Sequence, residues 1–117
     1  MTSEIPQWIR EWISKDRLVS NKFRISHKYV RSSKRIQFME GEKDEQGTWI
    51  SFKYMVSSTK YGKYWVRYNK GLYECSCPFF KHRGICSHIF GVCQVSDTWP
   101  EKELLFPTRS ENKNFDF

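Results

Sequence analysis

Residues 75–88 read CSCPFFKHRGICSH: two cysteines one residue apart, eight further residues, then a cysteine and a histidine one residue apart. Side chains at i and i+2 of a strand point to the same face, so Cys75 and Cys77 can offer two thiolates to one ion. The spacer is long enough to reverse the chain, and Cys86 and His88 complete a tetrahedral set. Three thiolates and one imidazole form a usual structural zinc site, with no open position for water.

Other chemistry for these residues is disfavoured. The close spacing and the absence of an export signal favour a metal site over a disulfide framework. A catalytic Cys–His pair needs a free thiolate beside a base, and metal ligation would occupy both groups. The alternatives that stay open are a set of buried thiols with a capping histidine, and His82 in place of His88 as a ligand. Cys93 is predicted to be a small packed hydrophobe.

The sequence around this pattern resembles the SWIM-type zinc finger. The resemblance is carried by the runs YWV at 64–66, YECSCPF at 73–79 and GICSHIF at 84–90, and it covers about residues 61–95. It implies an aromatic-rich hairpin before the metal site and an apolar helix after it. It also implies the zinc ligands Cys75, Cys77, Cys86 and His88, and binding to DNA or to other proteins.

The N-terminal residues predict a helix. An apolar stripe follows i, i+3, i+4, i+7 and i+8 spacing, with Ser3 as N-cap and Pro6 in the first turn; it consists of Ile5, Trp8, Ile9, Trp12 and Ile13. The opposite face is mixed rather than rich in lysine, which favours a core-facing helix over a membrane-surface helix. Residues 21–33 stay open between strand, helix and loop.

A β-meander is predicted next. Alternating apolar residues indicate strands at 35–40, 48–57, 63–69 and 72–76, with turns at 41–47 and 58–62 and a tight link at Lys70–Gly71. Residues 86–95 favour a short helix. The predicted fold is therefore α+β: an N-terminal helix, an antiparallel β-meander ending in a zinc-bound ββα finger, and a short C-terminal helix.

The 117 residues are expected to form one compact unit. Within it, residues 1–60 hold the N-terminal helix and strands, 61–95 the zinc finger, and 96–117 a loosely ordered tail that Leu104, Leu105 and Phe106 pin. Aromatic residues make up 17% of the chain, which favours a packed core. No uncharged stretch is long enough to span a bilayer, and no phosphate-binding glycine loop occurs, so an intracellular protein is expected (cytoplasm or nucleoid, or nucleus).

The net charge of +7 is concentrated in two blocks, residues 17–35 and 53–83. The second block surrounds the proposed metal site and places Trp65 between Lys63 and Arg67 on one face of a predicted strand. Its candidate nucleic-acid contacts are Lys63, Trp65, Arg67, Lys70, Lys81 and Arg83. Cations neutralise phosphates and a ring can stack on a base, so the leading hypothesis is a non-enzymatic protein that binds nucleic acid, DNA first.

Two other functions are considered. The first is an adaptor that docks a partner protein through the zinc finger and the aromatic surface. The second is a metal-dependent nuclease built on Glu40, Glu42, Asp44 and Glu45, which is disfavoured because these acids lie in or beside one turn. No catalytic residue, small-molecule substrate or membrane partner is expected.

Overall fold

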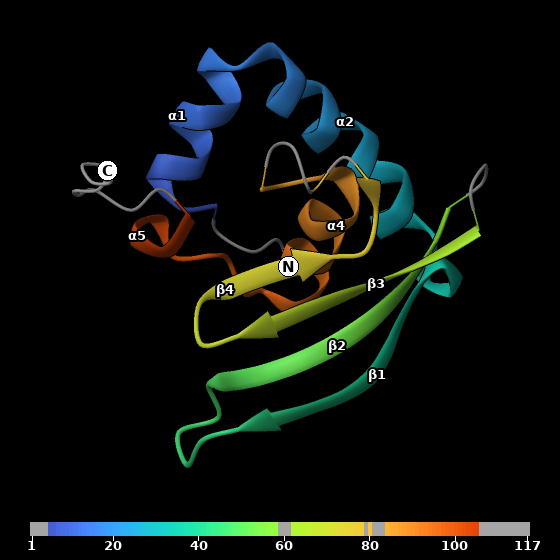
Figure 1. Cartoon of the computed structure of the whole chain (residues 1–117), viewed down its shortest axis with the longest axis vertical. Coiled ribbons are helices and arrows are strands. Elements are labelled where there is room, and N and C mark those ends of the chain that lie inside the picture. The colour runs from blue at the N-terminus through green and yellow to red at the C-terminus, as the bar shows by residue number, and fades with distance from the viewer. Residues whose placement is uncertain (1–4, 59–61, 79, 81–83, 106–117) are drawn as a thin grey trace, which may run out of the picture.

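The computed structural model describes residues 5–58, 62–78, 80 and 84–105. Its four strands form one antiparallel sheet in the order β1-β2-β3-β4, and its helices gather on one side of that sheet (Figure 1). The elements are α1 (Gln7–Lys15), α2 (Arg17–Arg31), the 3₁₀ turn η1 (Ser33–Arg35), β1 (Ile36–Lys43), β2 (Trp49–Ser58), β3 (Gly62–Asn69), β4 (Leu72–Cys75), α4 (Ser87–Ser96) and α5 (Lys102–Leu105). The predicted α+β class and meander are confirmed.

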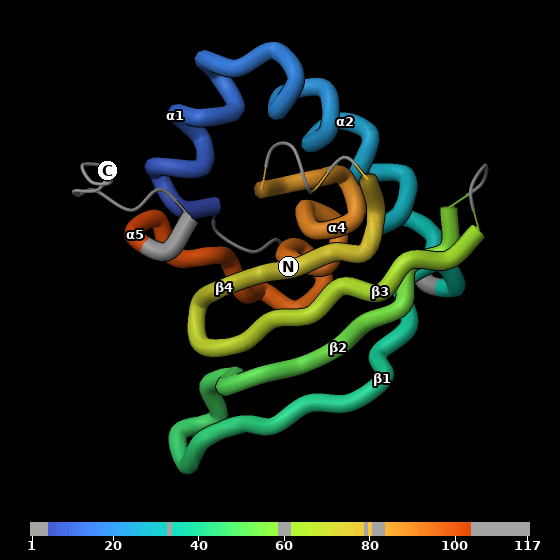
Figure 2. The backbone as a smooth tube through the Cα atoms, viewed as in Figure 1, coloured from blue at the N-terminus to red at the C-terminus, as the bar shows by residue number. Residues whose placement is uncertain are grey.

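Helix α4 occupies the centre of the molecule. Every residue from Ser87 to Cys93 is buried, and the helix packs on β3 and β4 on one side and on α2 on the other. Ile89, Phe90, Val92 and Cys93 are fully buried although they point to different sides of α4, as expected of a helix inside the core. The backbone trace in Figure 2 shows α1 and α2 on the outside of this layer, and the β1–β2 hairpin extending away from the helices.

The predicted N-terminal helix is confirmed, with a correction at its start. Helix α1 begins at Gln7, so Pro6 occupies the N-cap position rather than the first turn, and Ser3 lies outside the described residues. Ile9 is fully buried, and the rings of Trp8 and Trp12 stack with centroids 6.0 Å apart. The apolar stripe packs against the core, as expected of a core-facing helix.

Residues 21–33, which the sequence left open, lie mostly in α2. Asp16 caps this helix, because its Oδ1 accepts hydrogen bonds from the backbone N–H groups of Leu18 and Val19. The buried face runs through Val19, Ser26 and Tyr29. A serine at the centre of that face hides the helical period in the sequence.

Close contact between α2 and α4 fixes their relative position. Phe23 and Phe90 meet edge to face with centroids 5.3 Å apart, and Gln94 Nε2 donates to Ser26 Oγ at 2.9 Å. A Cβ atom added at Gly91 would lie 3.2 Å from Ile36 Cδ1 and 3.5 Å from Tyr29 Cβ. Glycine at this position therefore allows α4 to approach both α2 and the start of the sheet.

The strands follow the predicted alternation, with one correction in the first turn. Strand β1 continues to Lys43, because a bulge after Phe38 keeps Gly41 and Glu42 paired with Phe52 and Ser51. The turn is therefore shorter than predicted. The Lys70–Gly71 link is confirmed: both residues have positive φ, 49° and 94°, as in a two-residue hairpin turn.

The C-terminal part of the described chain returns to the sheet. The backbone N–H of Glu101 donates to the carbonyl of Gly71 at 2.8 Å, just before α5. The side chains of Leu104 and Leu105 and the whole of Phe106 lie outside the described residues, so their predicted pinning role stays a prediction. Among the helices that the structure describes, none combines the length and apolarity needed to cross a membrane.

Candidate metal centre

The four predicted ligands converge where β4 ends and α4 begins. One donor atom from each of Cys75, Cys77, Cys86 and His88 lies within 4.8 Å of the other three, and all four residues are buried. Cys75 is the last residue of β4, Cys86 directly precedes α4, and His88 is the second residue of α4. The sequence pattern thus brings one strand end and one helix start to a single point.

The spacing of the donors fits a zinc ion. With Zn–S of ~2.3 Å and Zn–N of ~2.0 Å, the sulfur–nitrogen edge of a tetrahedron is about 3.5 Å. The Nδ1 atom of His88 lies 3.8 Å from Cys75 Sγ and 3.7 Å from Cys86 Sγ. These distances, together with the Cys₃His donor set, suit a structural zinc site.

The electrostatics of the cluster also favour a bound cation. Cys75 hydrogen-bonds to the Cys77 sulfur, which raises the pKa of Cys75 to about 12 and lowers the pKa of Cys77. Burial raises the pKa of Cys86 well above its usual value. Hydrogen bonds from the neighbouring thiols thus stabilise one thiolate, that of Cys77. Ionisation of all three buried sulfurs requires a positive ion among them.

Local backbone features position the ligands. The Ser76 N–H donates to the Trp65 carbonyl at 3.1 Å, and the Trp65 N–H donates to Ser76 Oγ at 3.1 Å, so β3 holds the residue between the first two cysteines. Gly84 has φ +75° and donates its N–H to the Phe80 carbonyl. The positive φ of this glycine lets the chain turn before Cys86.

Two tyrosines that the sequence analysis did not single out pack against the histidine. The ring of Tyr64, on β3, lies 4.9 Å from the His88 ring, and the ring of Tyr29, on α2, lies 5.4 Å from it. The period-two pattern of residues 63–69 places Tyr64 on the inner face. Nothing in the sequence places Tyr29 beside His88, because that contact depends on how α2 packs on α4.

Cys93 and His27 are not members of the four-ligand cluster. Cys93 is fully buried and has a free thiol, as predicted for a packed small hydrophobe. His82 lies outside the described residues. His27 is half-buried and contacts the Phe23 ring edge to face, with centroids 4.9 Å apart.

The structure brings three of the predicted nucleic-acid contacts to one face. Lys63, Trp65 and Arg67 alternate with inward-facing residues of β3, and the Arg67 guanidinium lies 4.2 Å from the Trp65 ring centroid. Lys70 lies in the turn at the opposite end of the hairpin from Cys75. The other two candidates, Lys81 and Arg83, lie outside the described residues.

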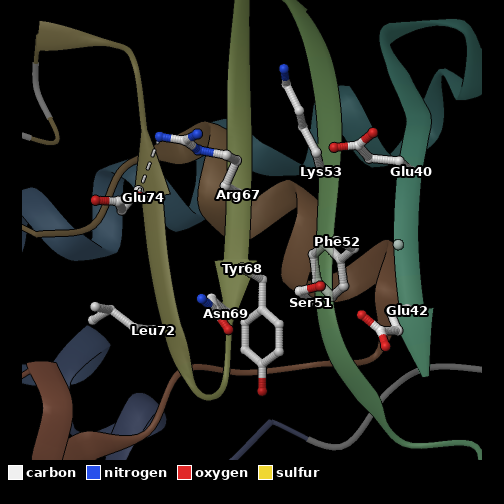
Figure 3. Close-up of a pocket in the computed structure, with 11 residues that line it drawn as sticks. Glu40, Glu42, Ser51, Phe52, Lys53, Arg67, Tyr68, Asn69, Leu72 and Glu74 are labelled. Carbon is white, nitrogen blue, oxygen red and sulfur yellow. Dashed lines mark ion pairs between the residues drawn. The ribbon is translucent and has the colours of Figure 1, made fainter. Parts of the chain in front are cut away.

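A row of four charged residues, two cations flanked by two carboxylates, crosses this outer face of the sheet. The strand register aligns four residues, one from each strand: Glu40, Lys53, Arg67 and Glu74. Figure 3 shows them at one edge of a shallow hollow of about 710 Å³, with the Arg67–Glu74 ion pair drawn across β3 and β4 at 3.6 Å. Lys53 is a member that the sequence analysis missed, although its alternation with Phe52 and Tyr54 indicates the outer face.

The acidic residues of the β1–β2 hairpin do not share one site. Glu40 and Glu42 line the hollow on the outer face. Asp44 instead organises the turn, where its Oδ1 accepts hydrogen bonds from the backbone N–H groups of Gln46 and Thr48. Among the residues that the structure describes, the Cys₃His cluster is the one group of potential metal ligands that converges.

Comparison with known proteins agrees with this geometry. No curated protein and no solved structure matches the chain. The family model of the SWIM zinc finger matches residues 64–97, which include most of β3, all of β4, the four clustered ligands and α4. Residues 64–97 are therefore a SWIM zinc finger with a buried Cys₃His cluster suited to structural zinc.

Proposed function

We propose that the protein is a non-enzymatic module that binds nucleic acid, DNA first, through a surface held in place by the zinc finger. The zinc ion would supply structural stability alone, because four protein donors leave no coordination position for a reacting water. It would tie the end of β4 to the start of α4 and so hold the β3–β4 hairpin and the spacer against the helical layer. All four cysteines are free, which fits the reducing interior of a cell.

The observation that carries this proposal is the arrangement of Lys63, Trp65 and Arg67 on the outer face of β3. A half-buried ring between two exposed cations suits nucleic acid, since the cations neutralise phosphates and the accessible part of the ring can stack on an unpaired base. Arg67 also pairs with Glu74, but both side chains are 54% exposed. An ion pair this exposed contributes little, so a phosphate can replace the carboxylate.

A salt titration of binding to a labelled DNA duplex tests the proposal. Affinity should fall steeply as salt rises, and the double change Lys81→Ala with Arg83→Ala should make that dependence less steep. Cys86→Ser serves as the control in which the finger is not held together. If the protein shows no salt-sensitive binding to a duplex and none to a single strand, the proposal is ruled out.

A second candidate function is protein docking, which one observation favours. Phe38 and Met39 are 50% and 51% exposed, and they lie on β1, an edge strand whose residues after Ile36 are all exposed. An edge strand with apolar side chains is a site where another chain can pair. A pull-down that yields one dominant protein, retained at high salt and after nuclease treatment, would favour this function.

A further inference from the structure

Helix α2 carries a stripe of positive charge on its outer face. Four basic residues follow each other at steps of seven, four and three along the helix, and Lys34 continues the series in η1; this stripe consists of Arg17, Arg24, Lys28, Arg31 and Lys34. The four residues of α2 at these steps lie on one side of the helix, and Lys34 follows them after Ser32, whose backbone is extended. All five are exposed, whereas Val19, Ser26 and Tyr29 form the buried face.

Acidic residues are absent from this part of the chain. The sequence holds no Asp or Glu from Arg17 to Met39. Within the described residues, none of the five stripe side chains forms an ion pair with a carboxylate. The outer face of the sheet differs, because there Lys53 and Arg67 lie in a row with Glu40 and Glu74. The stripe is therefore the more strongly cationic of the two surfaces.

The stripe is also rigidly placed. Phe23, Ser26 and Tyr29 fasten α2 to α4 and to the metal cluster, through Phe90, Gln94 and His88 respectively. From Arg17 to Arg31 the helix rises about 21 Å, at ~1.5 Å per residue. Successive phosphates of one DNA strand rise about 3.4 Å along the duplex axis while they wind around it, so a helix of this length can face several of them.

The aromatic residues of α2 do not belong to the stripe. Tyr29 is buried, and Phe23 packs against Phe90 in the core. Binding through stacked, unpaired bases needs aromatic side chains on the binding surface. A row of cations without such rings instead suits the closely spaced phosphates of a duplex.

We propose that the α2 stripe is the main phosphate-binding element of this protein and that its ligand is the backbone of double-stranded nucleic acid. This inference rests on the proposed function, and it assigns the dominant contact to α2 rather than to the β3–β4 hairpin. Phosphate contacts position a protein on a duplex without reading its sequence. Binding through the stripe is therefore insensitive to base sequence and strongly sensitive to salt.

The test compares two triple variants of the zinc-loaded protein that remove the same charge. The stripe variant carries Arg24→Gln, Lys28→Gln and Arg31→Gln. The control variant carries Arg10→Gln, Lys15→Gln and Lys102→Gln, three exposed positions outside α2 and the hairpin. Binding to a labelled 20-base-pair DNA duplex, to an RNA duplex and to a single strand of equal length is measured across a range of salt concentrations, and circular dichroism establishes that both variants are folded.

The stripe variant should lose about 2.7 from the slope of log affinity against log salt for either duplex, at ~0.9 per phosphate contact, and the control should keep the wild-type slope. An equal loss in both variants would overturn the inference, since net charge alone would then govern binding. The inference would also be overturned if the stripe variant kept the wild-type slope while the double variant Lys63→Gln with Arg67→Gln had a reduced slope. That result would leave the proposed function intact. Binding to vesicles of anionic lipid but to no nucleic acid would overturn both.

Discussion

The ring of Tyr29 lies against the imidazole of His88, with centroids 5.4 Å apart and planes inclined at 53°. One ring belongs to the cationic helix α2 and the other to the candidate metal cluster. Tyr64 approaches the same imidazole from β3, at 4.9 Å. The ligand histidine is therefore held between a helix and a strand, and the contact with Tyr29 links the metal cluster to α2.

The first prediction concerns this contact. Tyr29→Ala removes a buried ring and should lower the free energy of unfolding by about 3–5 kcal/mol, as large aromatic deletions in cores do. It should also weaken zinc binding, because the ring holds the histidine in position; groups that orient a ligand are commonly worth about 10–100-fold in affinity. Denaturant unfolding and competition with a chromogenic chelator measure the two effects.

Tyr29→Phe is the matched control, since it keeps the ring against His88 and removes only the hydroxyl. It should retain zinc affinity within a few-fold of the wild type. Equal loss of zinc affinity in both variants would show that the ring contact does not orient the histidine.

The second prediction separates the ligand cysteines from Cys93. The purified protein should hold one zinc ion per chain by elemental analysis. Cys86→Ala should lose it, whereas Cys93→Ala should keep it, although both thiols are buried and both lie at or in α4. Zinc in the Cys86→Ala protein at the wild-type level, or its loss from Cys93→Ala, would contradict the assignment of the four ligands.

Much of this architecture could be predicted from residue order alone. Apolar and polar residues alternate along the strands of the meander because one face of the sheet is buried. Phe52, Tyr54 and Val56 therefore predict β2 without any tertiary information. The metal cluster could be predicted for a similar reason. Its ligands lie close together in the chain, and the strand end and helix start that carry them are local features.

What could not be predicted depends on contacts between distant segments. Helix α2 could not be predicted because its buried face holds Ser26, whose hydroxyl forms a hydrogen bond with Gln94 on another helix. The charge row across the sheet depends on the register of all four strands, including a bulge after Phe38 that a period-two pattern does not contain. In both cases the missing information is a partner remote in sequence.

The third prediction concerns alkaline pH. Burial raises the pKa of the Cys93 thiol, so the thiol stays neutral in the folded protein. In the unfolded chain a cysteine ionises near pH ~8.5. The raised folded-state pKa therefore contributes stability that is fully present below about pH 8.5 and is lost as pH rises above it, by about 1.4 kcal/mol per pH unit for one group.

Denaturant unfolding of the zinc-loaded protein between pH 7 and 10 measures this effect. The Cys93→Ala variant should be less stable than the wild type at pH 7, and the difference should shrink above about pH 8.5. Ionisation of the three ligand cysteines is common to both proteins and cancels in the comparison. A difference that stays constant across the pH range would show that the Cys93 thiol does not titrate differently in the two states.

The fourth prediction concerns Glu74, whose carboxylate lies 3.6 Å from the Arg67 guanidinium on the outer face of the sheet. Glu74→Gln should change the free energy of unfolding by less than about 1 kcal/mol, because both side chains are largely exposed. It should raise affinity for a DNA duplex at low salt by a few-fold, since Arg67 no longer faces an anion that competes with phosphate. Glu103→Gln, an exposed position on α5, makes the same change in net charge away from the hairpin. A rise of equal size in the two variants would place Arg67 outside the interface, whereas a rise confined to Glu74→Gln would place β3 beside the bound duplex and make Arg67 a contact additional to α2.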